Sequence, residues 1–507
     1  MTTVNPTVLR PSVVERSTTR RSRLRRSLSS APLWLAFICS GQIALALRPG
    51  LNKNAFEDEG LYLGTGHRMI AYLLHGTSVA QHPGAFFSGA PGLYPVLGAT
   101  ADSVGGLAAA RDVSLGFAVI ATIATYGIGS RLFGKLAGLI GAASFVICGS
   151  VIYLSHFATY DSMTMALVAL AAWLAIYSSQ RDGFLWGPVV AVVLALAFLT
   201  KYAGAAYIPI VIALAAVIGW PLYGWKVVRR AAFALVATAV LTFASIELWG
   251  RDMIPGVVST TSNRNVLIHA TPSHLIGQIA VWVGPWLALA VVGALFRVRR
   301  QWALVSVLLV GAIVGPADQV RIGESISLAK HVAFGMVFAA PLIGDLFARG
   351  LRRAPARVAP VTLAVFGLLA MSGLHYSHQF LTSWVDDRAL QPVLAHDLAA
   401  QPGTHVLGER NTPQMYELRT VTTTNQWADT YYFQYSGLID KPAYAKAIDQ
   451  HYFGVVYLDM STQFGSYVHD YLTAHPQYYH LSAKVPRYLR GKVVGHWLVY
   501  TPKTIGS

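Results

Sequence analysis

The chain has 507 residues, of which 54% are hydrophobic and only 12% are charged, and its formal net charge is +16. This composition excludes a string of ordinary soluble domains and is typical of a protein that crosses the membrane many times. The positive charge does not indicate nucleic-acid binding, because the basic residues gather in an N-terminal tail and in short gaps between apolar runs, as in cytoplasmic loops. The only cysteines, Cys39 and Cys148, lie in apolar segments and offer no disulfide framework.

Apolar runs of about 17–20 residues predict a polytopic α-helical membrane protein with about 11 transmembrane helices. The runs lie near 31–47, 110–130, 136–154, 162–179, 184–199, 203–219, 230–249, 276–296, 301–316, 331–347 and 358–374. If the basic tail 1–30 is cytoplasmic, the basic gaps fall inside and the C-terminus falls outside. We interpret the first run as a retained signal anchor, because many spans follow it. Residues 31–374 are therefore predicted to form the transmembrane domain.

The first external loop, about 48–109, contains the triplet Glu57, Asp58 and Glu59 in a chain that is short of acid. Three neighbouring carboxylates repel one another, so the triplet favours a site for a proton, a metal or a polar substrate over a solvated acidic loop. Apolar spacing in 63–74 predicts a helix lying in the membrane interface. The segment 91–108 is apolar but broken by proline and glycine, which predicts a re-entrant or surface-lying segment.

Later spans carry further charged candidates at their external ends. Asp161 opens a span, where it can act as a base towards a hydroxyl or simply cap its helix. Lys201 lies in a tight turn between two apolar runs, where an ammonium can contact a phosphate at the membrane surface or extend to the headgroups. Lys330 and His331 begin another span from the same face, and Arg321 lies in the loop before it. Asp161 is thus a candidate catalytic residue together with Asp58 and Glu59. The residues predicted to bind substrate are Lys201, Lys330, His331 and Arg321.

Three histidines share the first external loop with the acids, namely His67, His75 and His82. Their spacing does not place them on one face of one helix, so a structural or interfacial role is favoured. A divalent ion held by Asp58 or Glu59 with a histidine stays open as an alternative. The chain contains no phosphate-binding GxxxxGK[ST] loop, HExxH helix or GxSxG elbow. ATP-driven transport and serine or zinc hydrolysis therefore lack support.

The composition changes after residue 375, where charges of both signs return and tyrosines become dense. Strand-like runs at 453–458 and 497–501 alternate with helical runs at 387–400 and 464–474. We predict that 375–507 form an extracytoplasmic α/β domain.

Three segments together resemble a known family. FEDEGLY at 56–62, HFATYD at 156–161 and LAFLTK at 196–201 are similar to three motifs of the GT-C glycosyltransferases. The most similar branch contains the protein O-mannosyltransferases and the lipid A aminoarabinose transferases. The resemblance covers roughly 30–350, with the motifs in the same order and on one membrane face.

The resemblance implies an inverting, mannosyltransferase-like hexosyl- or pentosyltransferase. Such an enzyme moves a sugar from a polyprenyl-phosphate carrier to an acceptor hydroxyl outside the cytoplasmic membrane. Carried over to this chain, Asp58 is the base that activates the acceptor, and Glu59 positions substrate or a cation. Asp161 holds the acceptor or the geometry of the site, and Lys201 contacts the carrier phosphate. The segment around Lys330 and His331 matches the later lipid-phosphate region only loosely.

The implied partners are the polyprenyl-phosphate sugar donor, membrane lipid, and a protein, lipid or wall-polymer acceptor. Two other classes of protein stay open. A transporter or flippase of polyprenyl-linked sugars would use the same charges as a binding site, although repeated halves are not evident. A non-catalytic envelope assembly protein would bind glycans through its C-terminal domain, but it leaves the acidic triplet unexplained.

Overall fold

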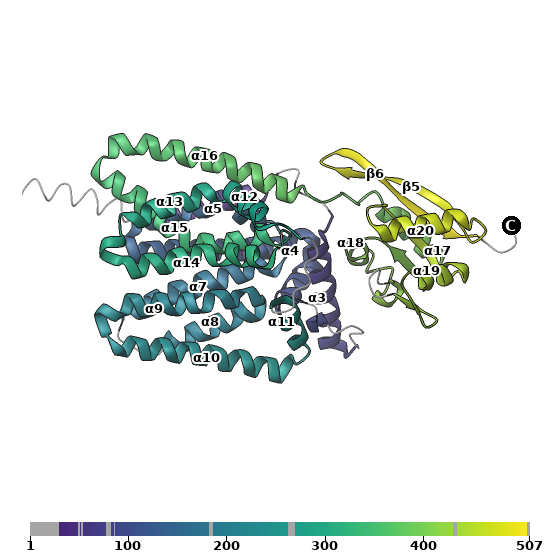
Figure 1. Ribbon diagram of the computed structural model, residues 1–507, viewed down its shortest axis with the longest axis horizontal. Coiled ribbons are helices and arrows are strands. Elements are labelled where there is room, and N and C mark those ends of the chain that lie inside the picture. The colour runs from purple at the N-terminus through teal and green to yellow at the C-terminus, as the bar shows by residue number, and fades with distance from the viewer. Residues whose placement is uncertain are drawn as a thin grey trace, which may run out of the picture.

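The computed structural model describes residues 30–48, 51, 54–77, 83–85, 87–181, 186–261, 269–428 and 433–503. The basic tail and His82, about which the sequence analysis made predictions, lie outside these residues. Figure 1 shows a helical bundle at one end of an elongated molecule and a smaller unit with strands at the other.

The bundle consists of helices that cover every predicted apolar run. They are α2 (Ala31–Ala46), α4 (Tyr94–Phe133), α5 (Lys135–Val146), α6 (Gly149–Ser155), α7 (Tyr160–Ser179), α8 (Trp186–Thr200), α9 (Ile208–Tyr223), α10 (Trp225–Trp249), α12 (Pro272–Trp282), α13 (Gly284–Leu295), α14 (Val298–Ile322), α15 (Leu328–Arg353) and α16 (Pro355–Leu381). In the described part of the chain, 7 helices are long and apolar enough to cross a membrane, or up to 9 spans if each of two bent pairs counts as one. The remaining two predicted spans correspond to the shorter apolar helices Ala31–Ala46 and Gly187–Thr200.

Two predicted spans are bent, where the sequence had suggested continuous helices. α5 and α6 meet at 73°, and α12 and α13 meet at 76°. Pro285, in the first turn of α13, has no N–H to continue the ladder from α12. Between α5 and α6, a Cβ on Gly373 of α16 would lie 1.8 Å from the carbonyl oxygen of Ile147. The bend between α5 and α6 is therefore packed directly against the backbone of α16.

Burial within the bundle indicates which helices face lipid. α15 is buried along nearly its whole length, whereas α10 and α16 present exposed apolar side chains such as Phe243 and Leu368. An apolar outer surface of this kind is expected when hydrocarbon replaces water around the helices. The fold is that of a multi-pass membrane protein.

The segment 91–108 is the first arm of a longer helix. α4 begins at Tyr94 and runs to Phe133, but Gly105 and Gly106 interrupt it with non-helical backbone angles. Gly106 has φ +66°, a left-handed conformation that glycine adopts without steric cost. The predicted break between this segment and the following span is therefore present, and it takes the form of a kink.

Residues after Leu381 form an α/β unit around a four-stranded sheet in the order β1-β4-β6-β5. The strands are β1 (His405–Gly408), β4 (Phe453–Leu458), β5 (Tyr479–Leu489) and β6 (Lys492–Pro502), and β2 (Gln434–Tyr435) and β3 (Leu438–Ile439) form a separate ribbon. β1 is parallel to β4, with Val406 opposite Val455, and the other pairs are antiparallel. The helices are α17 (Gln391–Ala400), α18 (Asn411–Glu417), α19 (Asp440–Asp449) and α20 (Gln463–Ala474). We call this unit the C-terminal domain.

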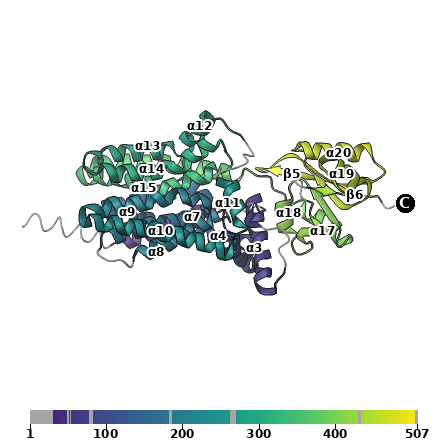
Figure 2. The ribbon, with the colours of Figure 1, turned by 60° about the horizontal axis from the view of Figure 1, so that its bottom comes forward.

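The C-terminal domain is attached to the end of the bundle where α3 (Glu57–His75) lies. Figures 1 and 2 show α3 running across the bundle axis, between the bundle and α18. Asp102 of α4 accepts hydrogen bonds from Tyr416 and, at 2.8 Å, from Arg419, both of the C-terminal domain. Arg68 of α3 donates to Thr424 at 3.0 Å. These polar contacts fix the domain over the first turn of α3.

Candidate active site

The acidic triplet forms the first turn of α3, which begins at Glu57. The sequence placed these residues in a loop ahead of a helix at 63–74, so the helix starts earlier than predicted. Carboxylates in the first turn interact favourably with the unpaired N–H groups of a helix N-terminus, which offsets part of their mutual repulsion. The Phe56 N–H donates to Glu59 Oε2 at 3.0 Å and closes the turn. The triplet is therefore held in a fixed geometry.

Glu59 is fully buried and bound to Arg111 of α4 by two hydrogen bonds. Arg111 Nε lies 2.8 Å from Oε1, and Arg111 Nη2 lies 2.7 Å from Oε2. The Ala158 N–H adds a third bond at 2.8 Å. Burial raises the pKa of Glu59, but the Arg111 guanidinium and the backbone N–H groups outweigh it, so the pKa lies below its ordinary value. Glu59 thereby joins α3 to α4 and to the segment that precedes α7.

Asp58 lies beside Glu59 and belongs to a different group of charges. Its Oδ2 atom pairs with Lys330 Nζ at the start of α15. The same Nζ lies 4.0 Å from Asp161 Oδ2, and Asp161 Oδ1 pairs with Lys201 Nζ. The carboxylates of Asp58 and Asp161 and the ammonium groups of the two lysines thus form one cluster, which we call the charge cluster. It joins α3, α7, α15 and the residue that directly follows α8.

The charge cluster is buried except at Asp58. Side chains of Asp161, Lys330 and Lys201 are 0%, 6% and 7% exposed, whereas Asp58 is 29% exposed. A buried charge is costly unless it is paired, so the alternation of acids and lysines explains how these groups share the interior. Thr159 Oγ1 donates to Asp161 Oδ2 at 2.9 Å and satisfies one further lone pair. Asp58 is the member of the cluster that solvent or a substrate can reach.

Aromatic side chains line the cluster, and of these only His331 was predicted from the sequence to belong to the site. Tyr62 of α3 and Tyr160 of α7 are hydrogen bonded through their hydroxyls at 2.6 Å. Lys201 Nζ lies 5.4 Å from the centre of the Tyr160 ring, a cation–π distance. His331 is buried and stacks on Phe334, with 5.8 Å between ring centres. The positions of the other rings depend on helix packing, so no spacing in the sequence marks them.

Arg321 lies outside the charge cluster. It is in the last turn of α14, with a side chain 66% exposed, and it pairs with Asp318 at 2.9 Å. Its partner is three residues earlier on the same helix, which is an ordinary surface pair. The structure therefore brings together Asp58, Asp161, Lys201, Lys330 and, on the first turn of α15, His331, but leaves Arg321 apart.

The residues around Asp58 do not fit a divalent metal ion. His67 Nε2 binds Asp102 Oδ2 at 2.5 Å, His75 is exposed at the end of α3, and both oxygens of Glu59 bind Arg111. Across the described ranges, no group of three or more His, Cys, Asp or Glu side chains is arranged to hold a metal. Two ammonium groups instead occupy the position beside the carboxylates where a cation would lie.

The C-terminal domain reaches the triplet through α18 and the residue before it. A Cβ on Gly60 would meet the carbonyl oxygen of Thr412, in the first turn of α18, at 3.0 Å, so α18 touches α3 two residues beyond Asp58. Burial and then the Asp58 charge raise the pKa of Glu57, and the Arg410 guanidinium partly opposes this rise. Glu57 and Arg410 thus interact electrostatically across the contact between bundle and domain.

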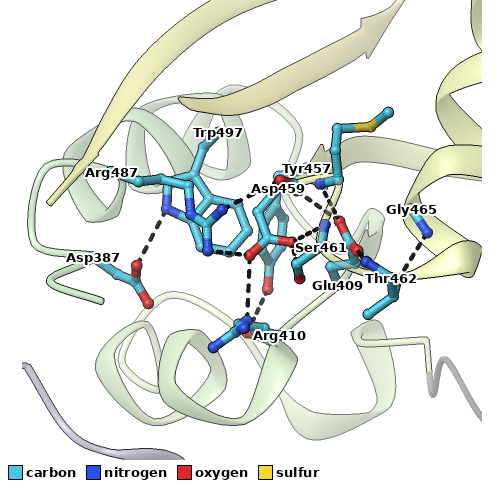
Figure 3. A network of polar contacts seen from close by, with 11 residues as sticks. Asp387, Glu409, Arg410, Tyr457, Asp459, Ser461, Thr462, Gly465, Arg487 and Trp497 are labelled. Atoms are coloured by element: carbon cyan, nitrogen blue, oxygen red, sulfur yellow. Dashed lines mark hydrogen bonds and ion pairs between the residues drawn. The ribbon is translucent and has the colours of Figure 1, made fainter. Parts of the chain in front are cut away.

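A polar network holds Arg410 in place (Figure 3). Asp459 follows β4 and pairs with Arg487 and, at 3.3 Å, with Arg410. Glu409 follows β1 and accepts backbone N–H groups from Asp459 at 2.7 Å and from Thr462 at 2.8 Å. The carboxyl ends of parallel strands meet at one edge of a sheet, and this edge is turned towards α3.

Comparison with known proteins agrees with this geometry. Residues 105–249 match the family model of dolichyl-phosphate-mannose-protein mannosyltransferases. No curated protein matches the chain.

Solved structures match nearly the whole chain. ArnT from Cupriavidus metallidurans in the apo state has a TM-score of 0.63 at 13% identity over 93% of this chain and 98% of its own. ArnT from the same organism bound to undecaprenyl phosphate has a TM-score of 0.65 at 12% identity, over 92% of this chain and 98% of its own. The Archaeoglobus fulgidus oligosaccharyltransferase in complex with Zn and sulfate has a TM-score of 0.57 at 14% identity. The match covers 91% of this chain and 72% of the oligosaccharyltransferase. The chain therefore shares its fold with these solved membrane proteins, and residues 105–249 also match the mannosyltransferase family model.

Proposed function

We propose that the protein moves a sugar from a polyprenyl-phosphate carrier to an acceptor hydroxyl, with Asp58 as the general base. The charge cluster is the observation that carries this proposal, because it sets one accessible carboxylate beside two buried ammonium groups. A phosphate is a good leaving group, so the reaction needs a base for the nucleophile and positive charge for the departing phosphate more than it needs an acid. A glycoside hydrolase would instead need a carboxylic acid aimed at the leaving oxygen.

In the proposed step, the acceptor oxygen attacks the anomeric carbon as Asp58 takes its proton. The bond between that carbon and the phosphate oxygen breaks, and its electron pair stays on the phosphate. Lys201 and Lys330 stabilise this charge, which a low-dielectric site makes more effective. A single displacement inverts the anomeric carbon. The match to ArnT bound to undecaprenyl phosphate supports a lipid phosphate as the leaving group.

Glu59 and Asp161 are assigned positioning roles. The three hydrogen bonds of Glu59 fix the turn that carries Asp58, so we assign it to this task and no longer to substrate or cation binding. Asp161 holds Lys201 and lies 4.0 Å from Lys330 Nζ. It therefore fixes the position of the Lys201 ammonium group and lies close to that of Lys330.

We place the acceptor between the first turn of α3 and the C-terminal domain. Glu57 and Arg410 interact electrostatically there, next to Asp58, and both are polar groups suited to a glycan, peptide or lipid headgroup. With a cytoplasmic N-terminus this face is extracytoplasmic, and the C-terminal domain lies outside the cytoplasmic membrane.

The test is Asp58→Asn in proteoliposomes supplied with polyprenyl-phosphate sugars and membrane acceptor. Because a positioned base contributes about 10²–10⁴-fold, we expect transfer to fall by that factor while the fold is retained. Asp318→Asn is the matched control, because Asp318 is an exposed acid at the end of α14 paired only locally with Arg321. Normal transfer by Asp58→Asn, with the control also active, contradicts the role of Asp58.

A further inference from the structure

The tip of the β5–β6 hairpin exposes an apolar surface beside two cations. Tyr488, Val493 and Val494 are 36%, 53% and 50% exposed. Arg490 and Lys492 are exposed between them. The rest of the hairpin is ordinary sheet, in which Trp497 and Val499 are buried in the core. We call residues 488–494 the hairpin tip.

The backbone gives the tip a defined shape and direction. Arg490 and Gly491 both have positive φ, 51° and 76°, as in the two-residue turns that match the twist of a hairpin. The pairing register of β5 with β6 shifts between Arg487 and Tyr488. Such a bulge bends the strand at the point where the tip begins. The tip is therefore a fixed projection of the sheet.

The tip is located beside the lipid-facing side of the bundle. Asp386 lies five residues beyond Leu381, the last residue of α16. Its N–H donates to the Tyr488 carbonyl oxygen at 2.8 Å. α16 is the most lipid-facing of the spans, with only 11% of its apolar window buried. Figure 1 shows the hairpin turned back towards the end of α16, level with α3, and Figure 2 shows the same direction. The tip thus lies where the apolar surface of the bundle ends.

We propose that the hairpin tip inserts into the headgroup region of the membrane and binds anionic lipid. Tyrosine rings favour the boundary between hydrocarbon and water, and valines gain by leaving water there. Arginine and lysine beside them extend to headgroups and attract anionic ones. The C-terminal half of α3 exposes Tyr72, Leu73 and Leu74 at the same level, so the molecule contacts the interface at two separated places.

This contact has a consequence for the proposed site. Arg487, directly before the tip, pairs with Asp459, and Asp459 pairs with Arg410. The hairpin therefore ties the domain edge that faces Glu57 to the membrane surface at a second point besides α18. Membrane insertion does not depend on the proposed reaction, so the two can be tested separately.

The test places an environment-sensitive fluorophore on the hairpin of the full chain in lipid nanodiscs. Val494→Cys carries the probe in a chain with Cys39 and Cys148 changed to alanine. Leu481→Cys is the matched control, because it is a comparably exposed apolar residue, 49%, on the same hairpin away from the tip. We expect a blue shift and strong quenching by lipids spin-labelled near the headgroup for position 494 and neither for position 481. Equal, weak quenching at both positions overturns the proposal.

The charge of the tip is tested with Arg490→Gln together with Lys492→Gln in the labelled Val494→Cys chain. Quenching at position 494 should be stronger in nanodiscs with anionic lipid than in purely zwitterionic ones, and the double variant should lose this difference. Quenching that is independent of lipid charge in the unaltered tip overturns the assignment to anionic headgroups.

Discussion

At the scale of single residues, the charge cluster combines stability with function. Lys201 neutralises Asp161, a carboxylate with no exposed surface. Removing one partner of a buried ion pair leaves the other charged and desolvated, which costs far more than the pair contributes. The same lysine is proposed to meet the donor phosphate. A substitution of Lys201 must therefore be tested for its effect on stability and for its effect on donor use.

Lys201→Ala should destabilise the protein by about 3 kcal/mol, at the low end for a broken buried pair, because Lys330 still lies 4.0 Å from Asp161. It should also weaken use of the donor, seen as a rise in the donor concentration needed for half-maximal transfer. Thermal unfolding in detergent and transfer kinetics measure the two effects. The double variant Lys201→Ala with Asp161→Ala should regain much of the stability and none of the donor use. A single variant as stable as the parent contradicts the pairing.

A second residue, Asp387 in the C-terminal domain, makes stability depend on pH. Burial raises the pKa of this carboxyl to about 6 from an ordinary 3.8, although it accepts a hydrogen bond from Trp497 Nε1 at 3.2 Å. The folded state then binds more protons than the unfolded state between those values, so stability falls as pH rises from about 4 to about 6. Asp387→Asn should remove this fall and stabilise the domain at pH 7.5 by about 1–3 kcal/mol.

Protection factors of β6 amides in hydrogen exchange, measured for the full chain at pH 4.5 and 7.5, check this prediction. Asp470→Asn is the control, because that acid is exposed on the surface of α20. If the difference in β6 protection between Asp387→Asn and the parent is the same at both pH values, the proposed effect of Asp387 on stability is contradicted.

The sequence identified the individual residues of the charge cluster but not the ion pairs that they form. Asp58, Asp161, Lys201 and Lys330 stood out because charge is rare in an apolar chain. Arg111 did not, since a charge near the start of a span looks like an ordinary end residue. Its bond with Glu59 depends on the kink at Gly105 and Gly106, which directs the first arm of α4 across α3. Pairings set by a kink cannot be derived from spacing alone.

At the scale of elements, α18 and α3 form the contact that holds the C-terminal domain over the site. Asp102 has no exposed side-chain surface and accepts hydrogen bonds from His67, Tyr416 and Arg419. Two of these donors belong to the C-terminal domain. The contact is therefore the point at which the domain can be loosened without altering the charge cluster.

Tyr416→Phe should weaken this contact by about 1.5–3 kcal/mol, the usual contribution of a hydrogen bond to a charged group. Faster hydrogen exchange in α18 and in the first turn of α3 reports the loss. Tyr435→Phe is the control, because its hydroxyl bonds only to Gln450 on the surface of the same domain, at 2.8 Å. Unchanged exchange in α18, or equal effects of both variants, contradicts the role of this bond.

Element positions followed from the sequence where periodicity or apolarity was strong. The strands expected at 453–458 and 497–501 lie within β4 and β6, and the helical runs predicted at 387–400 and 464–474 correspond to α17 and α20, the first of which begins four residues later than predicted. The start of α3 was missed, because the mutual repulsion of three adjacent carboxylates suggested a loop, whereas a helix N-terminus stabilises such charges. The bends in two spans were missed because the spans were predicted from apolarity alone. Pro285 marks one bend in the sequence, whereas the contact of Gly373 with Ile147 at the other bend depends on helix packing.

At the scale of the whole molecule, the arrangement fits the proposal that one face serves a lipid donor and a polar acceptor. The bundle presents an apolar surface to the membrane, and the charge cluster lies at the end where α3 crosses it. The C-terminal domain covers that end through α18, which touches α3 at Gly60. A carrier tail can lie among the helices while its phosphate meets the lysines and the acceptor enters from the domain side.

The most direct test follows the fate of the carrier phosphate. The purified chain is reconstituted with a panel of polyprenyl-phosphate sugars and with membranes from host cells that lack it, and free polyprenyl phosphate is measured by mass spectrometry. We predict acceptor-dependent release of polyprenyl phosphate by the parent protein, with about 10²–10⁴-fold less release by Asp58→Asn. Movement of the intact sugar-lipid across the bilayer without any release of polyprenyl phosphate would contradict a transferase and identify a transporter.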